Sequence, residues 1–416
     1  MRIFKFGGAS VKDAHGVKNV ASVLQKTGYE HTLIVISAMG KTTNALEIVI
    51  KNYFENKEEL QSSIQDIRKY HNAILLDLFD NENHAIFHKI NQFFEELNTF
   101  FKINKSPDYS YVYDQVIGYG ELVSTSIVSA YLNSINIKNT WIDVREHIKT
   151  DSYFRRANVD WESTQRLINQ NYNPNTLTIT QGFLASDSHN FTTTLGREGS
   201  DYTAAIYAYC LNAESVTIWK DVPGVLNADP RYFENAKLLN KISYREAIEL
   251  AFYGASVIHP KTLQPLQRKE IPLFVKSFLD PEAPGTQIGK NEDLEPKIPC
   301  FIVKKDQALI ALSSLDFSYI VEENISEIFS LLATYKMKVN VIQNSAISFS
   351  VCIDNIYDNL EKLLHHLKAK FKVTCHENVS LYTIRHYNEA SIHQIEASKT
   401  VLLKQLTQET TQVVTK

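Results

Sequence analysis

A continuous apolar run near the N-terminus limits the fold more than any other feature of the sequence. The run "TLIVISA" (Thr32–Ala38) shows no polar alternation, which is typical of a strand buried on both faces of a mostly parallel sheet. An earlier strand is predicted over Ile3–Phe6, and apolar residues at helical spacing predict a helix over Ala14–Lys26 between the two. This β-α-β unit favours an α/β sheet covered by helices.

The pattern continues downstream of this unit. Helical spacing is predicted over Asn44–Leu132, with an interruption at Ile103–Tyr111. Five further strands are predicted, at Asn139–Val144, Leu177–Phe183, Ser215–Trp219, Leu273–Lys276 and Gly285–Ile288. The polar, proline-bearing segments Asp280–Thr286 and Asn291–Pro299 then indicate a domain boundary.

Beyond this boundary the order of elements changes. The predicted elements are strand Ala308–Ser314, helix Ile325–Tyr335, strand Val339–Asn344, strand Ile347–Ile353, helix Asp358–Lys370 and strand Lys372–His376. This β-α-β-β-α-β order is that of a ferredoxin-like unit. A second unit is predicted to follow, with strand Val379–Ile384, helix Ser391–Thr407 and strand Thr411–Val414, and it is expected to be only half built.

Composition argues against several classes of protein. The 416 residues carry a formal net charge of −4 and give a sequence pI near 6.4, whereas nucleic-acid-binding domains are usually strongly basic. No apolar run reaches the ~18 residues that a membrane helix needs, and the N-terminus lacks the pattern of a signal peptide. The four cysteines are far apart and predict neither a zinc site nor a disulfide framework. We therefore expect a cytoplasmic protein without nucleic-acid or membrane partners and without a predicted metal-ligand set.

Two motifs follow the first two strands. "KFGGAS" places Lys5 just before Gly7-Gly8, so that an ammonium group and backbone N–H groups can meet a phosphate, although a plain strand-turn explains the motif as well. "SAMGKTTN" places Ser37 and Thr43 at the carboxyl end of a buried strand, where open α/β sheets bind ligands. These hydroxyl groups also fit the cap of the next helix.

Two further motifs carry one functional and one structural interpretation each. In "GYGELVS", Glu121 stands at the head of a helix, where the helix dipole favours a carboxylate and where it can also bind a substrate ammonium group. In "YGASVIHPKTLQP", His259 invites a metal or acid–base role. A structural role fits His259 better, because no other histidine stands at ligand spacing.

The stretch "TTLGREGSDYTAA" (193–205) is denser in charge than a helix cap requires. Ser200 or Asp201 can N-cap a helix that starts at Tyr202. A bare cap needs neither Arg197 nor a second acid, and the guanidinium group of Arg197 can grip a carboxylate or phosphate with two hydrogen bonds. Taken by itself, this stretch fits both a helix cap and an active-site loop.

The stretch "WKDVPGVLNADPR" (219–231) follows a strand and mixes both signs of charge. Lys220, Asp221, Asp229 and Arg231 suit a nucleotide polyphosphate, with the bases on phosphate and the acids on Mg²⁺ or ribose. A solvated charged loop is the alternative.

Together these motifs resemble those of the aspartate kinases, in the amino acid kinase family. "KFGGAS", "SAMGKTTN", "GYGELVS", "TTLGREGSDYTAA", "WKDVPGV", "ADPR", "YGASVIHPKTL" and "PGTQI" stand in the family's order. The resemblance implies an α/β fold: a three-layer α/β/α amino acid kinase domain over residues 1–290, an α+β ACT unit over 300–378 and a truncated second ACT unit over 379–416. It implies transfer of a phosphoryl group from ATP, with Mg²⁺, to the β-carboxylate of L-aspartate, giving 4-phospho-L-aspartate on the way to lysine, threonine and methionine. It also suggests a homodimer formed through the ACT region.

The resemblance also implies roles for single residues. The catalytic positions are Lys5 and Asp201. The aspartate-binding positions are Ser37, Thr43, Glu121, Arg197 and Ser200. The nucleotide-binding positions are Lys5, Gly7, Gly8, Lys220, Asp221 and Arg231. Because the accepting carboxylate is already an anion at neutral pH, catalysis rests on placement and on cancelling charge, and an acid at Asp201 can hold Lys5 in position.

Several positions depart from the family's pattern. Ala9 replaces a threonine or serine, Lys220 a frequent threonine, Leu226 a tyrosine, and Ser256 a lysine near the adenine site, so the nucleotide contacts of this chain are expected to differ. In the tail, "VEENIS" (321–326) lacks the usual glycine, and Asn340 stands where lysine-sensitive members have an aspartate. We expect weak or absent feedback inhibition by lysine.

Two alternatives are open to the sequence. One is a kinase of the same fold that acts on glutamate, acetylglutamate or UMP, against which Glu121 in "GYGELVS" and the ACT-like tail argue. The other is a catalytically inactive amino-acid sensor, against which the retained Lys5, Arg197 and Asp201 argue.

Overall fold

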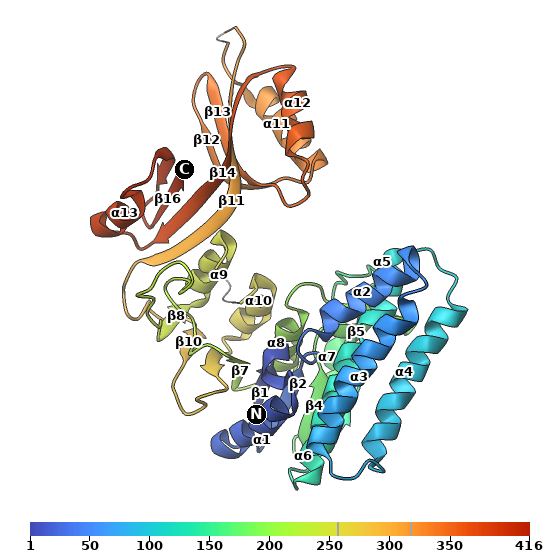
Figure 1. Cartoon of the computed structure of the whole chain (residues 1–416). Helices are drawn as coiled ribbons and strands as arrows, with labels where there is room; N and C mark the ends of the chain where they lie inside the picture. The colour runs from blue at the N-terminus through green and yellow to red at the C-terminus, as the bar shows by residue number, and fades with distance from the viewer. Residues whose placement is uncertain (256–257, 317) are drawn as a thin grey trace. The chain divides into compact units, whose positions relative to one another are not determined.

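The computed structural model describes residues 1–255, 258–316 and 318–416 (Figure 1). By contacts the chain separates into two compact units. The first comprises Met1–Val225, Leu238–Ile248 and Val257–Leu294, and the second comprises Leu226–Lys237, Glu249–Ser256 and Glu295–Lys416. The predicted division at residues 290, 300 and 378 stays a prediction. None of the described helices is long and apolar enough to cross a bilayer.

The first unit is built on an eight-stranded sheet with the order β3-β4-β2-β1-β7-β9-β10-β8. Its strands are β1 (Arg2–Phe6), β2 (Thr32–Ile36), β3 (Asn139–Ile142), β4 (Leu177–Gln181), β7 (Ser215–Lys220), β8 (Lys241–Ser243), β9 (Leu273–Ser277) and β10 (Thr286–Gly289). The pairs are parallel except β9 with β10, which is antiparallel. The mostly parallel sheet expected from the buried run of β2 is confirmed.

Side chains alternate along the central strands between two covered faces. On β1, Phe4 and Phe6 belong to the apolar cluster formed with α1 (Ala14–Thr27) and α6 (Tyr119–Ser134). Lys5 points to the opposite face, toward α8 (Gly199–Leu211), which α7 (Trp161–Asn171) and α10 (Pro260–Lys269) flank. The result is the three-layer α/β/α arrangement that the sequence predicts.

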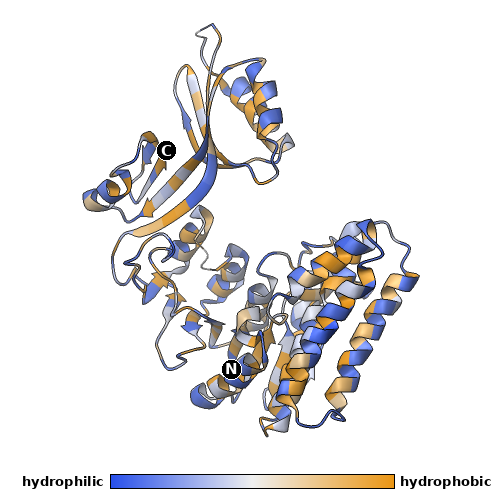
Figure 2. Ribbon diagram, viewed as in Figure 1, coloured by the Kyte–Doolittle hydropathy of each residue, from blue (hydrophilic) through white to orange (hydrophobic). Residues whose placement is uncertain are grey.

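Four helices extend this unit on the side of α6. They are α2 (Thr42–Glu55), α3 (Leu60–Leu78), α4 (Ala85–Ile103) and α5 (Tyr109–Ile117), and the predicted interruption falls between α4 and α5. Figure 2 shows hydrophobic and hydrophilic residues in alternating patches along α3 and α4, as expected of helices buried on one face. Their apolar residues join the same cluster that covers β1 and β2.

Several elements of the chain were not predicted from the sequence. They include the hairpin β5 (Leu184–Ser186) with β6 (Thr192–Thr194), the strand β8, and the helices α7, α9 (Tyr244–Tyr253) and α10. The two strands of the hairpin are only three residues long, which is too short for a pattern of alternation to show.

The second unit contains a single six-stranded antiparallel sheet with the order β12-β13-β11-β14-β16-β15. Its elements are β11 (Cys300–Ser313), α11 (Glu322–Thr334), β12 (Lys338–Asn344), β13 (Ser348–Asp354), α12 (Leu360–Lys368), β14 (Lys372–Arg385), α13 (Glu389–Glu396), β15 (Val401–Leu406) and β16 (Thr410–Thr415). The ferredoxin-like β-α-β-β-α-β order from β11 to β14 is confirmed.

Two long strands join the two halves of this sheet. The second half of β11 pairs with the first half of β14, and the first half of β11 pairs with the second half of β14. The pairing register shifts between Lys304 and Gln307, and again between Gln307 and Leu309. The half of the sheet that contains β15 and β16 therefore also includes the start of β11. This segment comes before all the elements of the other half in the chain. The predicted separate strands, 372–376 and 379–384, are one continuous strand.

The predicted helix Ser391–Thr407 is wrong in its second part. Helix α13 ends at Glu396, and β15 occupies Val401–Leu406. The leucines of this segment have helical spacing, but the short turn at 407–410 folds it back against β16. Tertiary pairing overrides the local pattern here.

Candidate active site

Four loops of the first unit leave the sheet at the same edge. Phe6, the last residue of β1, pairs with Ile36 of β2 and Trp219 of β7, and Ile36 pairs with Gln181 of β4. The residues that follow these strands therefore lie side by side at the carboxyl edge, where open α/β sheets bind their ligands. They belong to the motifs "KFGGAS", "SAMGKTTN" and "WKDVPGV" and to the stretch "TQGF" at 180–183, which was not singled out from the sequence.

The loops after β1 and β2 contact each other through their backbones. A Cβ atom on Gly8 would lie 2.8 Å from the carbonyl oxygens of both Ala38 and Gly40, so only glycine fits. Gly40 N donates to Gly8 O at 3.0 Å, and Gly40 itself has a φ of 53°. A Cβ atom on Gly7 would meet the ammonium group of Lys5 at 3.3 Å. The two glycines thus bring the backbone and the lysine of this motif together.

Lys5 and Asp201 form a buried ion pair across the sheet and α8. Lys5 Nζ lies 2.7 Å from Asp201 Oδ1, and the two side chains are only 11% and 6% exposed. The residues are 196 positions apart in the chain (201 − 5), so the fold alone brings them together. A pair this short and this buried fixes the ammonium group beside Gly7.

Helix α8 starts earlier than the sequence predicts, and the capping interpretation of Ser200 and Asp201 is wrong. The helix begins at Gly199, and its N-cap residue Glu198 has a φ of 54° and no side-chain cap bond. Both Ser200 and Asp201 lie in the first turn, so Asp201 is free to pair with Lys5. Glu198 Oε2 instead accepts a hydrogen bond from the backbone N of His259 at 2.8 Å.

His259 has the structural role that the sequence favours. It is the N-cap of α10, and its Nδ1 accepts from the backbone N of Lys261 at 3.2 Å. With its contact to Glu198, it ties the start of α10 to the loop before α8.

Ser200 and Arg197 occupy opposite environments on this loop. Ser200 is buried against Gly182, where a Cβ atom would lie 2.5 Å from Ser200 Oγ. Arg197 is exposed, and its guanidinium group has no hydrogen-bond or ion-pair partner among the described residues. It is therefore available to an anion at the rim of the site.

Glu121 is a buried carboxyl group with one free oxygen. Its Oε1 accepts from the backbone N of Ala38 at 3.4 Å, whereas its buried Oε2 has no hydrogen-bond partner within the described ranges. Burial raises the pKa of Glu121 to about 8, and the N–H groups of Ala38 and Glu121 and the charge of Lys5 offset part of that rise. An unsatisfied acid at a loop edge is a candidate for binding a cationic group.

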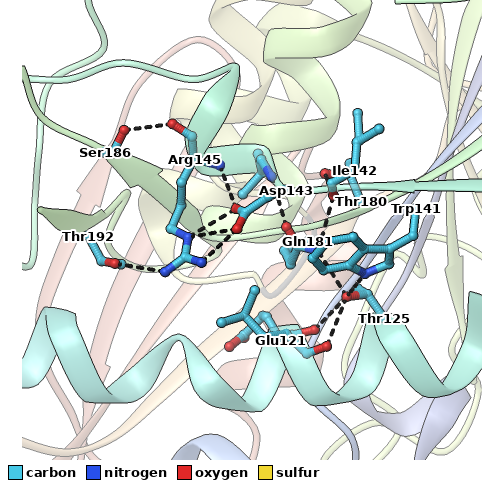
Figure 3. A network of polar contacts seen from close by, with 12 residues as sticks. Glu121, Thr125, Trp141, Ile142, Asp143, Arg145, Thr180, Gln181, Ser186 and Thr192 are labelled. Atoms are coloured by element: carbon cyan, nitrogen blue, oxygen red, sulfur yellow. Dashed lines mark hydrogen bonds and ion pairs between the residues drawn. The ribbon is translucent and has the colours of Figure 1, made fainter. Parts of the chain in front are cut away.

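A polar network holds the helix of Glu121 against the sheet (Figure 3). Thr125 Oγ1 donates to the carbonyl of Glu121 at 2.8 Å and accepts from Trp141 Nε1 at 2.9 Å and Gln181 Nε2 at 3.0 Å. Gln181 is fully buried, and its Oε1 accepts from the backbone N of Val144 at 2.8 Å. Single polar residues inside strands give no sequence signal, and Gln181 was missed for this reason.

A second anchor that sequence reasoning missed is Asp114 on α5. Its carboxylate accepts from the backbone N and Oγ1 of Thr194, at 2.9 and 2.8 Å, and from the backbone N of Arg155 at 2.9 Å. Burial raises the pKa of Asp114 to about 6, although these hydrogen bonds lower it in part. The guanidinium group of Arg155 lies over the ring of Tyr113, 4.6 Å from its centroid. Asp114 thus fixes the strand that leads into the loop of Arg197.

The remaining predicted residues lie at the edges of this arrangement. Ser37 follows β2, and its carbonyl accepts from Ser124 Oγ at 2.8 Å. Thr43 stands in the first turn of α2, beside the buried Thr42. Lys220 ends β7 and Asp221 is exposed just beyond it.

Arg231 belongs to the second unit and is paired there. Its Nη2 lies 2.6 Å from Asp229 Oδ2 in an exposed loop. The predicted difference at Leu226 concerns the same unit, and the one at Ser256 lies outside the described residues.

Residues 1–277 match the family model described as "Amino acid kinase family". The chain is 32% identical over 392 residues to Lysine-sensitive aspartokinase 3 of Escherichia coli, covering 92% of this chain and 86% of that protein. It is 33% identical over 368 residues to Aspartokinase 1, chloroplastic, of Arabidopsis thaliana, covering 85% of this chain and 63% of that protein.

The fold is similar to that of solved aspartokinases. The crystal structure of E. coli aspartokinase III in complex with lysine and aspartate (T-state) matches with a TM-score of 0.84 and 29% identity, covering 100% of this chain and 95% of that one. The structure of the same enzyme with aspartate and ADP (R-state) matches with a TM-score of 0.81 and 29% identity, covering 100% of this chain and 96% of that one.

Proposed function

Because the chain belongs to the amino acid kinase family, we propose that it is an aspartate kinase, which transfers a phosphoryl group from ATP to the β-carboxylate of L-aspartate. The observation that carries the proposal is the buried ion pair between Lys5 and Asp201 beside the Gly7-Gly8 loop. The E. coli relative whose structure contains aspartate and ADP has the same fold over the whole of this chain.

The arrangement of charges suits a dicarboxylic amino acid. Glu121 offers a free carboxyl oxygen to the ammonium group of aspartate, and Arg197 offers an unpaired guanidinium group to its α-carboxylate. Three further residues are candidate contacts to aspartate: Ser37, next to the Ala38 that contacts Glu121, Ser200, three residues after Arg197, and Thr43, in the first turn of α2. Held at both ends, the substrate presents its β-carboxylate toward the loop of Lys5.

Lys5 supplies the positive charge for the transfer. The β-carboxylate oxygen attacks the γ-phosphorus of ATP, the bond from that phosphorus to the β,γ-bridging oxygen breaks, and ADP leaves. No strong base is needed, because the attacking group is an anion at neutral pH. Asp201 holds the ammonium group in place, and Lys5 with the N–H groups near Gly7 and Gly8 stabilises the negative charge that moves with the phosphoryl group.

The residues present fit a nucleotide that brings its own Mg²⁺. The described part of the chain contains no cluster of three potential metal ligands, and Mg²⁺ commonly binds through substrate phosphates with one or two carboxylates. When bound, the ion would neutralise phosphate charge. Asp221 is an exposed carboxylate directly after β7, and Lys220 and Asp221 are the candidate nucleotide contacts of the first unit. The nucleotide contact of Arg231 stays a prediction, because Arg231 lies in the second unit and pairs there with Asp229.

The wider roles are proposals that rest on the same relationship. The product, 4-phospho-L-aspartate, would feed the synthesis of lysine, threonine and methionine in the cytoplasm. The ACT-like region would pair two copies of the chain into a homodimer.

The test is ADP release by the full chain with Mg-ATP and L-aspartate, with hydroxylamine to trap the acyl phosphate. We expect aspartate-dependent turnover that Asp201→Ala lowers by about 10²-fold or more. The matched control is Glu214→Gln, because Glu214 also pairs with an amine, the N-terminus at 2.6 Å, but at the other end of β7. Absence of aspartate-dependent turnover in the wild type would refute the proposal and leave the inactive sensor as the better interpretation.

A further inference from the structure

A groove beside the candidate active site lies between α2 and α3, and it includes Lys41 and Thr42 of the "SAMGKTTN" motif. It has a volume of about 480 Å³, within the roughly 300–1,000 Å³ of small-molecule sites. The two helices are joined by a short connection at 56–59, so the start of α2 lies beside the middle and end of α3. The groove is lined by Lys41, Thr42, Ala45, Ile48, Ser63, Asp66, Ile67 and Tyr70.

The walls of this groove are apolar and its rim carries one charge of each sign. Ile48 is 56% exposed, although a branched aliphatic side chain on a helix is usually covered. Lys41 is exposed and has no partner in the described residues. Among the described residues, Asp66 forms one ion pair, of 3.7 Å with Lys69. The side chains of Lys69 and Asp66 are 78% and 75% exposed, so this pair contributes little to stability.

The inner wall of the groove contacts the loops that follow β1 and β2. The hydroxyl group of Tyr70 donates to the carbonyl of Lys12, just after the Gly7-Gly8 motif, and would lie 2.7 Å from a Cβ atom on Gly40. Thr42 Oγ1 donates to the carbonyl of Met39 at 2.6 Å and lies 3.4 Å from Nε2 of the buried His71. A ligand that presses on Tyr70 or Thr42 therefore acts on the loop of Ser37.

We propose that the groove between α2 and α3 binds a small zwitterion with an apolar side chain, that is, a hydrophobic amino acid. Its side chain packs on Ile48, Ile67 and Tyr70. Its carboxylate faces Lys41 and its ammonium group faces Asp66, so both charges of the zwitterion meet an opposite charge at the rim. The occupant is small because the volume matches a single small molecule.

Titration calorimetry on the full chain without substrates tests this inference independently of catalysis. The probes are leucine, methionine and phenylalanine, with 4-methylpentanoate and 3-methylbutylamine as analogues that each lack one charge. We expect at least one of the three amino acids to bind with a Kd of about 1 mM or lower, and each single-charge analogue of leucine at least about tenfold more weakly than leucine.

Variants place the binding in the groove. Asp66→Asn is expected to weaken binding of the amino acid about tenfold, and Ile48→Glu to abolish it. Leu76→Glu is the matched control, because Leu76 is a similarly exposed apolar residue of α3 (51%) that does not line the groove. Binding that survives Ile48→Glu unchanged would place the ligand elsewhere and overturn the proposal. It is also overturned if no probe binds at about 10 mM, or if Ile48→Glu instead alters the sedimentation of the protein, which would make the groove a contact between copies.

Discussion

Glu121 shows how a single residue can couple substrate binding to pH. In the free protein its pKa is raised to about 8 from the ordinary value of 4.5, mainly by burial. Between pH 4.5 and about 8, the folded state therefore holds a proton at Glu121 that the unfolded state has already released. This contribution to stability is complete below pH 4.5 and is lost as the pH rises through about 8.

A bound ammonium group reverses this preference, because it favours the charged carboxylate. We expect aspartate binding at pH 7 to release about one proton, measured by calorimetry in two buffers of different ionisation enthalpy. We also expect the KM for aspartate to fall as the pH rises from about 6.5 to 8.5. Glu121→Gln should show weaker binding without proton release, and equal proton release in this variant would contradict the assignment.

The site also depends on elements that contribute no substrate-binding residue but position the loops that do. Helix α5 holds the strand before the loop of Arg197 through Asp114, which accepts from the buried backbone N and hydroxyl group of Thr194, and through Gln115, which exchanges hydrogen bonds with the backbone of Thr192. Gly182 is a comparable case, because Ser200 of α8 leaves no room for a Cβ atom there.

Asp114→Ala is expected to lower both stability and substrate affinity. Each buried group of Thr194 that is left without a partner costs about 1–3 kcal/mol. Urea denaturation measures the loss, and the KM for aspartate should rise because the strand before Arg197 loosens. The matched control is Asp108→Ala at the exposed N-cap of the same helix, which should cost about 1 kcal/mol and leave the KM unchanged. Equal effects of both variants would remove Asp114 from any role in positioning.

The sequence predicts those elements whose pattern is strong and local. The buried run at β2 and the helix α1 follow directly from their apolar spacing, and the pairing of Lys5 with Asp201 follows from the family's motifs. The segment Val401–Leu406 was predicted wrongly, because its leucines fit a helix until β16 is there to pair with them. Asp114 and Gln181 could not be predicted, because their partners are set by packing between distant segments.

At the scale of the whole molecule, the second unit bears on regulation by amino acids. Asn340 is already satisfied within the chain: its Oδ1 accepts from Lys304 Nζ at 2.7 Å and its Nδ2 donates to Gln307 Oε1 at 2.7 Å. The pKa of Lys304 is lowered, first by burial and then by the nearby charge of Lys338. The ammonium groups of Lys304 and Lys338 near Asn340 disfavour the ammonium group of a bound lysine there. This supports the expectation of weak feedback inhibition by lysine.

A steady-state assay with added lysine measures this expectation directly. Inhibition by lysine should be absent or require concentrations well above about 1 mM, whereas a sub-millimolar inhibition constant would contradict it. The comparison should use saturating and limiting aspartate, so that competition at the active site is separated from an effect through the second unit.

The shared strands β11 and β14 have a consequence for how the chain is made. The second half of β14 lies between the first half of β11 and β16, and β16 ends at Thr415. During synthesis the first unit emerges long before this strand, whereas the six-stranded sheet stays open along β14 until residue 415 is available. Until β16 is in place, the edge of β14 that it covers keeps unpaired backbone groups and can pair with the same segment of another copy.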